Sequence, residues 1–282
     1  DPAPNLSRRL GNTVLLKRED LQPVFSFKLR GAYNKMAGLT PAELERGVIA
    51  ASAGNHAQGV ALGAQKLGCR AVIVMPVTTP EMKVKAVAAR GAEVVLHGDN
   101  YDAACTEATR LGTERGLTFI HPFDDPDVIA GQGTLALEML AAVPSLDTLV
   151  ISVGGGGLIG GVAAAARALR PEIEVVGVQA RRFPAMYNAV KGASLPQGES
   201  TLADGMAVGR PGEITREMIS RLVSDVVLVD EGHLEQAIVL LLEVEKTLVE
   251  GAGAAGLAAL LAEPARFRGR RVGLVLCGGN ID

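Results

Sequence analysis

The chain has 282 residues, of which 48% are hydrophobic and 21% are charged, and its formal net charge is −3. This composition suffices for a sizeable core in one large or two modest domains, and it argues against disorder. A weakly acidic chain without a long basic run lacks the electrostatic footprint of a protein that binds nucleic acid or a membrane surface. The expected partner is therefore a small molecule.

Cysteine usage and apolar runs bear on the compartment. Cys69, Cys105 and Cys277 are far apart and form no CxxC pair, which argues against a disulfide scaffold and a cysteine zinc site. A reducing compartment is indicated, and the predicted location is the cytoplasm. No apolar run approaches the roughly 18 residues of a membrane span. The first residues, DPAPNLSRRLGN, contain no signal-peptide core and read as the middle of a longer chain.

Short apolar runs rich in β-branched residues alternate with helical patterns along the chain. The runs that predict strands are residues 12–17, 47–52, 69–76, 91–98, 117–123, 147–153, 172–180, 225–230 and 271–277. The helical patterns cover residues 27–37, 56–68, 81–90, 101–114, 126–142, a stretch after 157, 231–249 and 252–262. This alternation predicts an α/β fold with mainly parallel sheets. The irregular stretch 191–212 is predicted to be a loop over a site.

Lys28 stands in an unusual setting for a charged residue. It follows Phe25, Ser26 and Phe27 at the start of a predicted helix, so a strongly hydrated ammonium group begins in apolar, aromatic surroundings. Its methylenes could lie along apolar surface with the amine in water. Alternatively, the amine is functional, because a desolvated lysine loses its proton more easily and can form a Schiff base with a carbonyl group. Lys28 alone leaves both interpretations open.

A glycine-rich turn between a predicted strand and a predicted helix is the most conspicuous motif. It reads SVGGGGLIGGVAAAA, and Leu158 follows four consecutive glycines: Gly154, Gly155, Gly156 and Gly157. Glycines let backbone amides approach an anion, and the helix N-terminus adds unpaired N–H donors and a favourable dipole. A tight strand-to-helix turn would show the same pattern, but four glycines in a row favour a phosphate-binding loop.

The same turn raises a dinucleotide alternative, because Gly155, Gly157 and Gly160 satisfy GxGxxG. That fingerprint further requires an acidic residue about 20 residues later, at the end of the next strand, to hold a ribose hydroxyl. The next predicted strand ends at Gln179, which lacks the charge, and no GK[ST] follows as in a Walker loop. A single phosphate monoester is favoured, and an NAD-dependent oxidoreductase remains an alternative function.

The stretch ASAGNHAQG forms a second strand-to-helix loop. It carries Ser52, Ala53, Gly54, Asn55 and His56, whose hydroxyl, side-chain amide and backbone amides would meet a carboxylate at a helix N-terminus. The loop is therefore predicted to clamp the carboxylate of a substrate. His56 is equally well explained as an ordinary histidine at a helix start. None of the four histidines has a spacing such as HExxH, so no metal site is predicted.

Cys277 ends the last predicted strand in LVLCGGNID, and by itself it is explained as an inert core cysteine. A reactive lysine, a monophosphate loop and a carboxylate clamp together fit one ligand. That ligand is pyridoxal 5'-phosphate, held through its aldehyde by the lysine, with an amino acid as the substrate.

The motifs SFKLRGA, SAGNHAQG, VIAGQGT, GGGGL, LADG and CGGN occur in this order along the chain. With them the chain resembles, over nearly its whole length, the threonine dehydratases (threonine ammonia-lyases) of the tryptophan-synthase-beta fold type. Serine racemases and cysteine synthases share that fold. The resemblance implies two α/β domains with the cofactor in the cleft between them. Residues 1–46 and 125–282 would form the large cofactor-binding domain and residues 47–124 the small substrate-clamp domain.

The resemblance also implies roles for single residues. Lys28 would hold the cofactor as a Schiff base and later remove the α-proton of the substrate. Phe27 would pack on the cofactor ring, and Asn55 would bond its 3'-oxygen. The stretch 154–158 would hold the phosphate, and Cys277 would face the pyridine nitrogen. The implied reaction converts L-threonine to 2-oxobutanoate and ammonia, and L-serine to pyruvate. A homo-oligomer, dimer or tetramer, and a place in isoleucine biosynthesis are expected.

The resemblance has departures that weigh on the alternatives. Cys277 stands where threonine dehydratases commonly have serine, and both side chains are neutral. Serine racemases place an acidic metal site after the strand that ends at Gln179, where this chain reads QARRFPA. They also have a serine at the position of Ala53, which returns a proton to the face opposite Lys28. A serine racemase and a non-catalytic amino-acid-binding protein are the remaining alternatives, and the lysine disfavours the second.

Overall fold

The computed structural model describes residues 1–281, and its elements follow the predicted alternation. The strands are β1 Thr13–Arg18, β2 Val48–Ala51, β3 Ala71–Met75, β4 Glu93–Leu96, β5 Thr118–Phe119, β6 Thr148–Ser152, β7 Glu174–Ala180, β8 Asp225–Val229 and β9 Arg271–Leu276. The α-helices are α1 Pro4–Leu10, α2 Lys28–Ala37, α3 Pro41–Arg46, α4 Asn55–Leu67, α5 Glu81–Ala88, α6 Tyr101–Arg115, α7 Pro126–Ala142, α8 Gly157–Leu169, α9 Ala185–Lys191, α10 Glu213–Leu222, α11 Glu231–Glu245, α12 Gly251–Ala262 and α13 Pro264–Phe267. Two 3-10 helices, η1 Glu19–Leu21 and η2 Asp204–Met206, complete the set.

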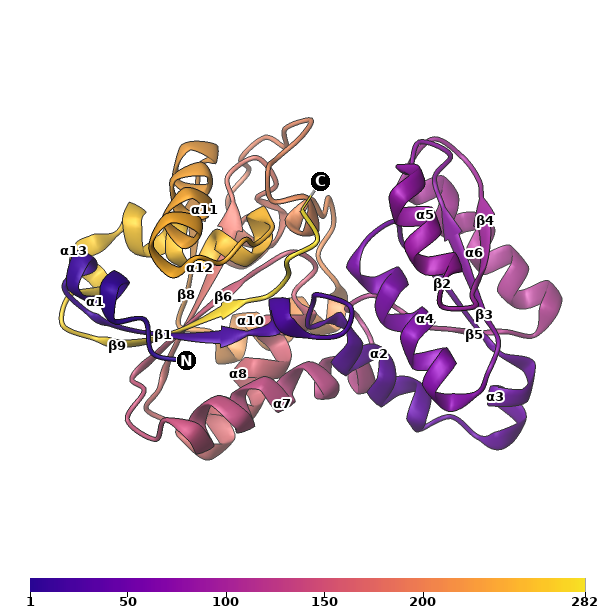
Figure 1. The fold of residues 1–282 in the computed structure, drawn as a ribbon, viewed down its shortest axis with the longest axis horizontal. Helices are drawn as coiled ribbons and strands as arrows, with labels where there is room; N and C mark the ends of the chain where they lie inside the picture. Colours follow the sequence, from indigo (N-terminus) through magenta and orange to yellow (C-terminus); the bar gives the residue numbers. More distant parts are fainter. Residues whose placement is uncertain (282) are drawn as a thin grey trace.

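The strands form two parallel sheets that lie in separate lobes (Figure 1). A five-stranded sheet has the order β1-β9-β6-β7-β8, and a four-stranded sheet has the order β4-β3-β2-β5. All five residues of β3 and all five of β6 are buried, as expected for strands covered by helices on both faces. The predicted α/β fold with mainly parallel sheets is confirmed.

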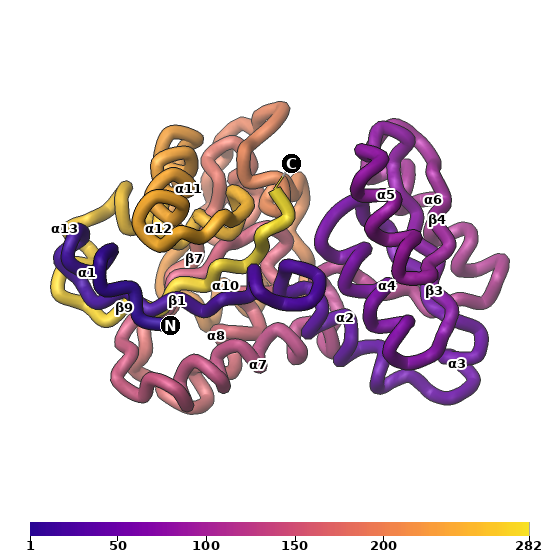
Figure 2. Tube along the Cα trace, viewed as in Figure 1, coloured from indigo at the N-terminus to yellow at the C-terminus, as the bar shows by residue number. Residues whose placement is uncertain are grey.

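The two ends of the chain meet in the larger sheet. β1 pairs in parallel with β9 over the full register from Thr13 with Arg271 to Arg18 with Leu276. Figures 1 and 2 show both strands in the same lobe, and the smaller sheet is built only from residues 48–119. No helix within residues 1–281 is both long enough and apolar enough to cross a membrane.

Helix α2 lies between the lobes and packs against both (Figure 2). A Cβ atom on Gly131 of α7 would lie 2.7 Å from the Cα atom of Gly31, and one on Gly59 of α4 would lie 3.0 Å from the carbonyl carbon of Lys28. Only glycine permits such close helix contacts. Met36 of α2 is buried in the core of the four-stranded sheet, although the predicted boundary after residue 46 assigns α2 to the other domain. The domain boundaries therefore stay a prediction.

Several predicted elements are shorter in the structure, and for two of them the structure shows the cause. The strand predicted at 117–123 pairs only at Thr118–Phe119, because the following residues turn away from the sheet towards the cleft described below. The helix predicted at 231–249 ends at Glu245, because Lys246 adopts a left-handed backbone conformation with φ of 55°. The structure also adds α1, α3, α9, α10 and α13, which were not predicted.

Candidate active site

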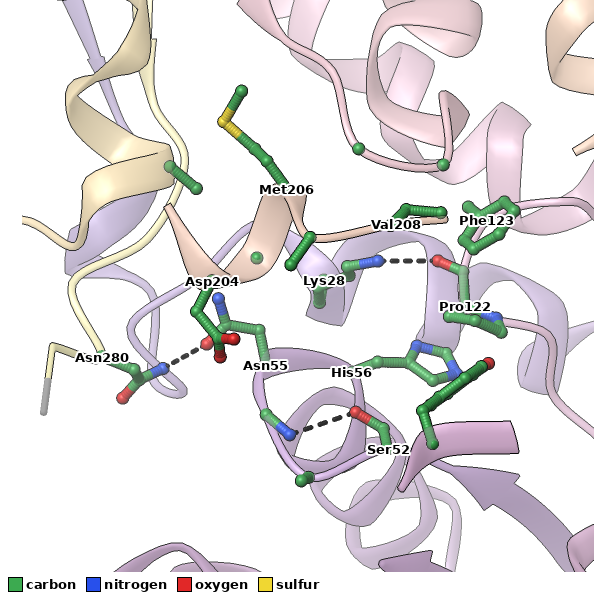
Figure 3. A pocket seen from close by; sticks show the side chains of 18 of the residues that line it. Lys28, Ser52, Asn55, His56, Pro122, Phe123, Asp204, Met206, Val208 and Asn280 are labelled. Carbon is green, nitrogen blue, oxygen red and sulfur yellow. Dashed lines mark hydrogen bonds between the residues drawn. The ribbon is translucent and has the colours of Figure 1, made fainter. Parts of the chain in front are cut away.

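A cleft of about 1720 Å³ is lined by residues from both lobes (Figure 3). It brings together every predicted site residue: Phe27, Lys28, Ser52, Ala53, Gly54, Asn55, His56, Gly154, Gly155, Gly156, Gly157, Leu158 and Cys277. They meet because the segments that follow β2, β6 and β9 lie at the carboxyl ends of parallel strands, where α/β folds place their ligands. Their individual roles towards a ligand stay predictions.

Lys28 is the first residue of α2, and its side chain reaches the cleft. Its Nζ atom donates a hydrogen bond to the carbonyl oxygen of Pro122 at 2.7 Å (Figure 3) and lies 5.4 Å from the ring centroid of Phe27. Desolvation lowers the pKa of Lys28 to about 8, although negative charge on Cys277 and Glu250 would raise this pKa. The amine of Lys28 therefore loses its proton more easily than that of an exposed lysine.

The glycine loop, residues 154–157, lines the cleft. Gly156 has a φ of 96° and precedes α8 without any side-chain cap, so the first N–H groups of this helix have no side-chain partner. A Cβ atom on Gly157 would lie 2.8 Å from the carbonyl oxygen of Phe123, so the loop is also closely packed from behind. Buried Thr215 fixes it further, because its hydroxyl donates to the carbonyl oxygen of Gly155 at 2.7 Å. These features suit a phosphate.

The clamp loop ends where α4 begins at Asn55. The hydroxyl of Ser52 accepts a hydrogen bond from the backbone N–H of Gly54 at 3.2 Å, so it is engaged within its own loop. His56 is buried, and its Nε2 atom lies 2.8 Å from the carbonyl oxygen of Ile120. Burial and the charge of Lys28 lower the pKa of His56 to about 3. His56 is therefore neutral, and its hydrogen bond connects α4 to the segment after β5.

Cys277 lies at the end of β9 and is only 2% exposed. Burial raises the pKa of its thiol to about 12, so it stays protonated at neutral pH. The hydroxyl of Ser152 donates a hydrogen bond to its sulfur at 3.4 Å. The carbonyl oxygen of Cys277 accepts a hydrogen bond from the backbone N–H of Phe27 at 3.1 Å, which connects the end of β9 to the start of α2. A neutral thiol is thereby held in the same cleft as Lys28.

Two functional candidates escaped the sequence analysis. Glu250 immediately precedes α12, and its carboxylate accepts a hydrogen bond from the side chain of Asn55 at 2.8 Å. Burial raises the pKa of Glu250 to about 7. Asn280 donates to the side chain of Asn55 at 2.7 Å (Figure 3). The sequence offered only a carboxylate ahead of the Gly- and Ala-rich run GAGAAGLAALLA, which is also ordinary at a helix N-terminus.

The residues present fit pyridoxal 5'-phosphate. The helix N-terminus without a side-chain cap suits the phosphate, the desolvated amine of Lys28 suits the aldehyde, and the protonated thiol of Cys277 suits an unprotonated ring nitrogen. The dinucleotide alternative fits less well, because Gln179 is fully buried outside the cleft lining and accepts a hydrogen bond from the backbone N–H of Tyr187. Residues 1–281 contain no cluster of three His, Cys, Asp or Glu side chains able to hold a metal ion.

Comparisons with known proteins agree with this geometry. A family model described as "Pyridoxal-phosphate dependent enzyme" matches residues 2–278. The L-threonine ammonia-lyase of Thermotoga maritima is 47% identical over 279 residues, which are 98% of this chain and 69% of that protein. Other curated relatives are longer, and the chain spans about half of their length.

Solved structures show the same relationship. The processed form of threonine deaminase isoform 2 from Solanum lycopersicum superposes with a TM-score of 0.95 at 42% identity, covering 100% of this chain and 79% of the other. Maize serine racemase superposes with a TM-score of 0.93 at 32% identity, covering 100% of this chain and 88% of the other. The fold is thus shared by lyases and racemases, and individual residues have to separate the two activities.

Proposed function

This chain belongs to the family of pyridoxal-phosphate dependent enzymes, and from that premise we propose that it is a threonine ammonia-lyase. The proposed reaction is dehydration and deamination of L-threonine to 2-oxobutanoate and ammonia, with L-serine as a slower substrate that gives pyruvate. The observation that carries the proposal is the desolvated Lys28 amine, which shares one cleft with the uncapped glycine loop and the clamp loop. The similarity to L-threonine ammonia-lyase supports threonine as the substrate.

The residues of the cleft would divide the work as follows. The amides of the stretch 154–158 bind the phosphate, and the clamp loop binds the substrate carboxylate. When bound, the cofactor supplies an electron-withdrawing ring that stabilises negative charge at the substrate α-carbon. The Nζ atom of Lys28, oriented by the carbonyl oxygen of Pro122, would take up the proton from the substrate α-carbon. Cys277, which remains a thiol, would share a hydrogen bond with the ring nitrogen, and Phe27 would pack on the ring.

The location, the oligomeric state, the pathway and the domain division belong to the same proposal. A cytoplasmic homo-oligomer, dimer or tetramer, is proposed, and so is a place in isoleucine biosynthesis. The word "biosynthetic" in the names of several relatives supports the second point. The division into a large domain of residues 1–46 and 125–282 and a small domain of residues 47–124 is retained as a proposal. The separate sheets on either side of the cleft support it.

The substrate assignment is tested by a steady-state comparison of L-threonine and L-serine. The yellow holoenzyme is expected to release 2-oxobutanoate and ammonia in equal amounts from L-threonine, with a higher kcat/KM than for L-serine. Both products are quantified, by a coupled dehydrogenase assay and by an ammonia assay. A protein that lacks bound pyridoxal phosphate, or that reduces NAD with either amino acid, contradicts the proposal.

The racemase alternative is tested at Ala53. This residue lines the cleft, and its side chain is a methyl group, which cannot return a proton from the face opposite Lys28. The wild-type enzyme is expected to form pyruvate from L-serine with little D-serine. Ala53→Ser is expected to raise D-serine formation by about 100-fold, the low end of what one acid–base group contributes. Chiral chromatography of the incubation measures both products.

Ala86→Ser provides the matched control for the racemase test. Ala86 also lines the cleft and belongs to α5, so this variant adds a hydroxyl group elsewhere in the same cavity. It is expected to form as little D-serine as the wild type. D-serine production by the wild-type enzyme at a rate comparable to pyruvate would refute the lyase assignment.

A further inference from the structure

Asn55 is held by two residues from the opposite lobe. Its Nδ2 atom donates to Oε1 of Glu250 at 2.8 Å, across 195 residues of sequence. Its Oδ1 atom accepts from Nδ2 of Asn280 at 2.7 Å, across 225 residues (Figure 3). Asn55 begins α4 on the small sheet, whereas Glu250 precedes α12 and Asn280 follows β9 of the large sheet. These two hydrogen bonds therefore connect the two sides of the cleft.

The hydrogen-bonding capacity of these groups fixes the orientation of the Asn55 amide. Asn280 presents an NH₂ group, whose second hydrogen bond goes to the carbonyl oxygen of Val24 at 2.9 Å, so it selects the oxygen side of Asn55. The NH₂ side of Asn55 is thereby left to face Glu250. Reversing the Asn55 amide would oppose donor to donor at Asn280. One N–H of Asn55 remains for a ligand.

The surroundings of Glu250 are built to admit its carboxylate. A Cβ atom on Gly278 would overlap the carboxylate oxygens of Glu250, so a larger residue there would displace this carboxylate. The backbone N–H of Asn280 also donates to this carboxylate. The charge of Asp204 raises the pKa of Glu250, and the charge of Lys83 lowers it. Lys28 and Cys277 lie in the same cleft. A buried carboxylate is costly unless its hydrogen bonds are made, which indicates that this position has a function.

We propose that Glu250 and Asn280 are positioning residues that hold the side-chain amide of Asn55 in one orientation across the cleft, so that its remaining N–H is presented to an oxygen of the cofactor. This inference rests on the proposed function, because it assumes that Asn55 faces pyridoxal phosphate. It goes beyond that function because it gives Glu250 and Asn280 a role in cofactor binding that they exert only through Asn55.

A double-mutant cycle tests the proposal. Asn55→Ala, Glu250→Gln and the double variant are prepared as apoproteins, and the dissociation constant for added pyridoxal phosphate is measured from its absorption spectrum. Asn55→Ala is expected to weaken binding by about 10-fold to 100-fold, and Glu250→Gln by about 10-fold, as for hydrogen bonds to charged groups. In the Asn55→Ala background, Glu250→Gln should change the dissociation constant less than about twofold, since its effect passes through Asn55.

Two further variants separate positioning from charge and from folding. Asp102→Asn removes a carboxylate from the same cleft that is not among the groups acting on Glu250, so any effect on binding should add to that of Asn55→Ala. Asn280→Asp changes a partly exposed residue and places an acceptor against Oδ1 of Asn55, so it should weaken binding as Glu250→Gln does while thermal unfolding stays cooperative. Fully additive effects of Glu250→Gln and Asn55→Ala overturn the proposal.

The outcomes also distinguish this proposal from the proposed function. An Asn55→Ala variant with unchanged affinity for pyridoxal phosphate overturns the positioning role together with the assignment of Asn55, while formation of 2-oxobutanoate from L-threonine by the wild type is unaffected. A wild-type protein that binds pyridoxal phosphate and shows the coupled cycle, but leaves L-threonine unchanged, supports the positioning role and refutes the reaction.

Discussion

Replacing Lys28 by alanine is expected to abolish turnover of L-threonine, with a loss in kcat of at least about 10⁴-fold. The variant would lose the amine that is proposed both to attach the cofactor and to remove the α-proton, and this amine is hydrogen-bonded to the Pro122 carbonyl oxygen beside the glycine loop. The side chain makes one hydrogen bond and lines a cleft, so the fold should survive. Steady-state assays and circular dichroism measure the two effects separately.

The same experiment identifies the lysine directly. Borohydride treatment of the wild-type holoenzyme is expected to attach a pyridoxyl group to the peptide that contains Lys28, as read by mass spectrometry. Lys83 also lines the cleft, and a label on its peptide would contradict the assignment. Lys66→Ala, on the exposed surface of α4, serves as the control and is expected to leave turnover unchanged.

The second large effect is expected at Gly157, where alanine should weaken binding of pyridoxal phosphate by about 10-fold to 10⁴-fold. Its Cβ atom would lie 2.8 Å from the carbonyl oxygen and 2.9 Å from the Cα atom of Phe123, so backbone has to shift. Displacing the first amides of α8 removes one or two hydrogen bonds to a charged phosphate, each worth about 1.5–3 kcal/mol. Spectroscopic titration of the apoprotein with the cofactor gives the change.

Gly160→Ala is the matched control for this prediction. Gly160 belongs to the same helix, but its nearest neighbour would be Sδ of Met218 at 3.6 Å, an ordinary contact. Alanine also favours a helix interior over glycine by roughly 0.5–1 kcal/mol, so the fold should not suffer. Gly160 is the third glycine of the GxGxxG pattern, which a dinucleotide site needs for close helix packing. Equal losses at both positions would contradict the phosphate-loop assignment.

Local patterns were sufficient for much of the fold and for the outline of the site. The buried strands read as continuous apolar runs, because both faces of a parallel sheet are covered, and helix boundaries followed from local signals. Helix α7 begins at Pro126 as predicted, and Asp125 caps it by accepting from the backbone N–H of Asp127 at 2.8 Å. The glycine loop and Lys28 were visible for the same reason, since their chemistry depends on a few neighbouring residues.

Other features depend on contacts that no local pattern encodes. The shortness of β5 and the end of α11 at Glu245 were not predicted, because pairing and a left-handed Lys246 are decided by the surroundings. The hydrogen bond from Ser152 to the sulfur of Cys277 joins residues 125 apart, and only folding shows that the thiol has a polar neighbour.

The division between sequence and tertiary structure is clearest around Asn55. The sequence by itself determined the α/β class and singled out the glycine loop and Lys28 as candidates, because periodicity, glycine runs and a charge in an apolar stretch are short-range properties. It did not reveal the hydrogen bonds of Asn55 with Glu250 and Asn280, which span 195 and 225 residues. Only the tertiary structure decided that orientation, because donors and acceptors from distant segments can match only after both sheets have folded and faced each other.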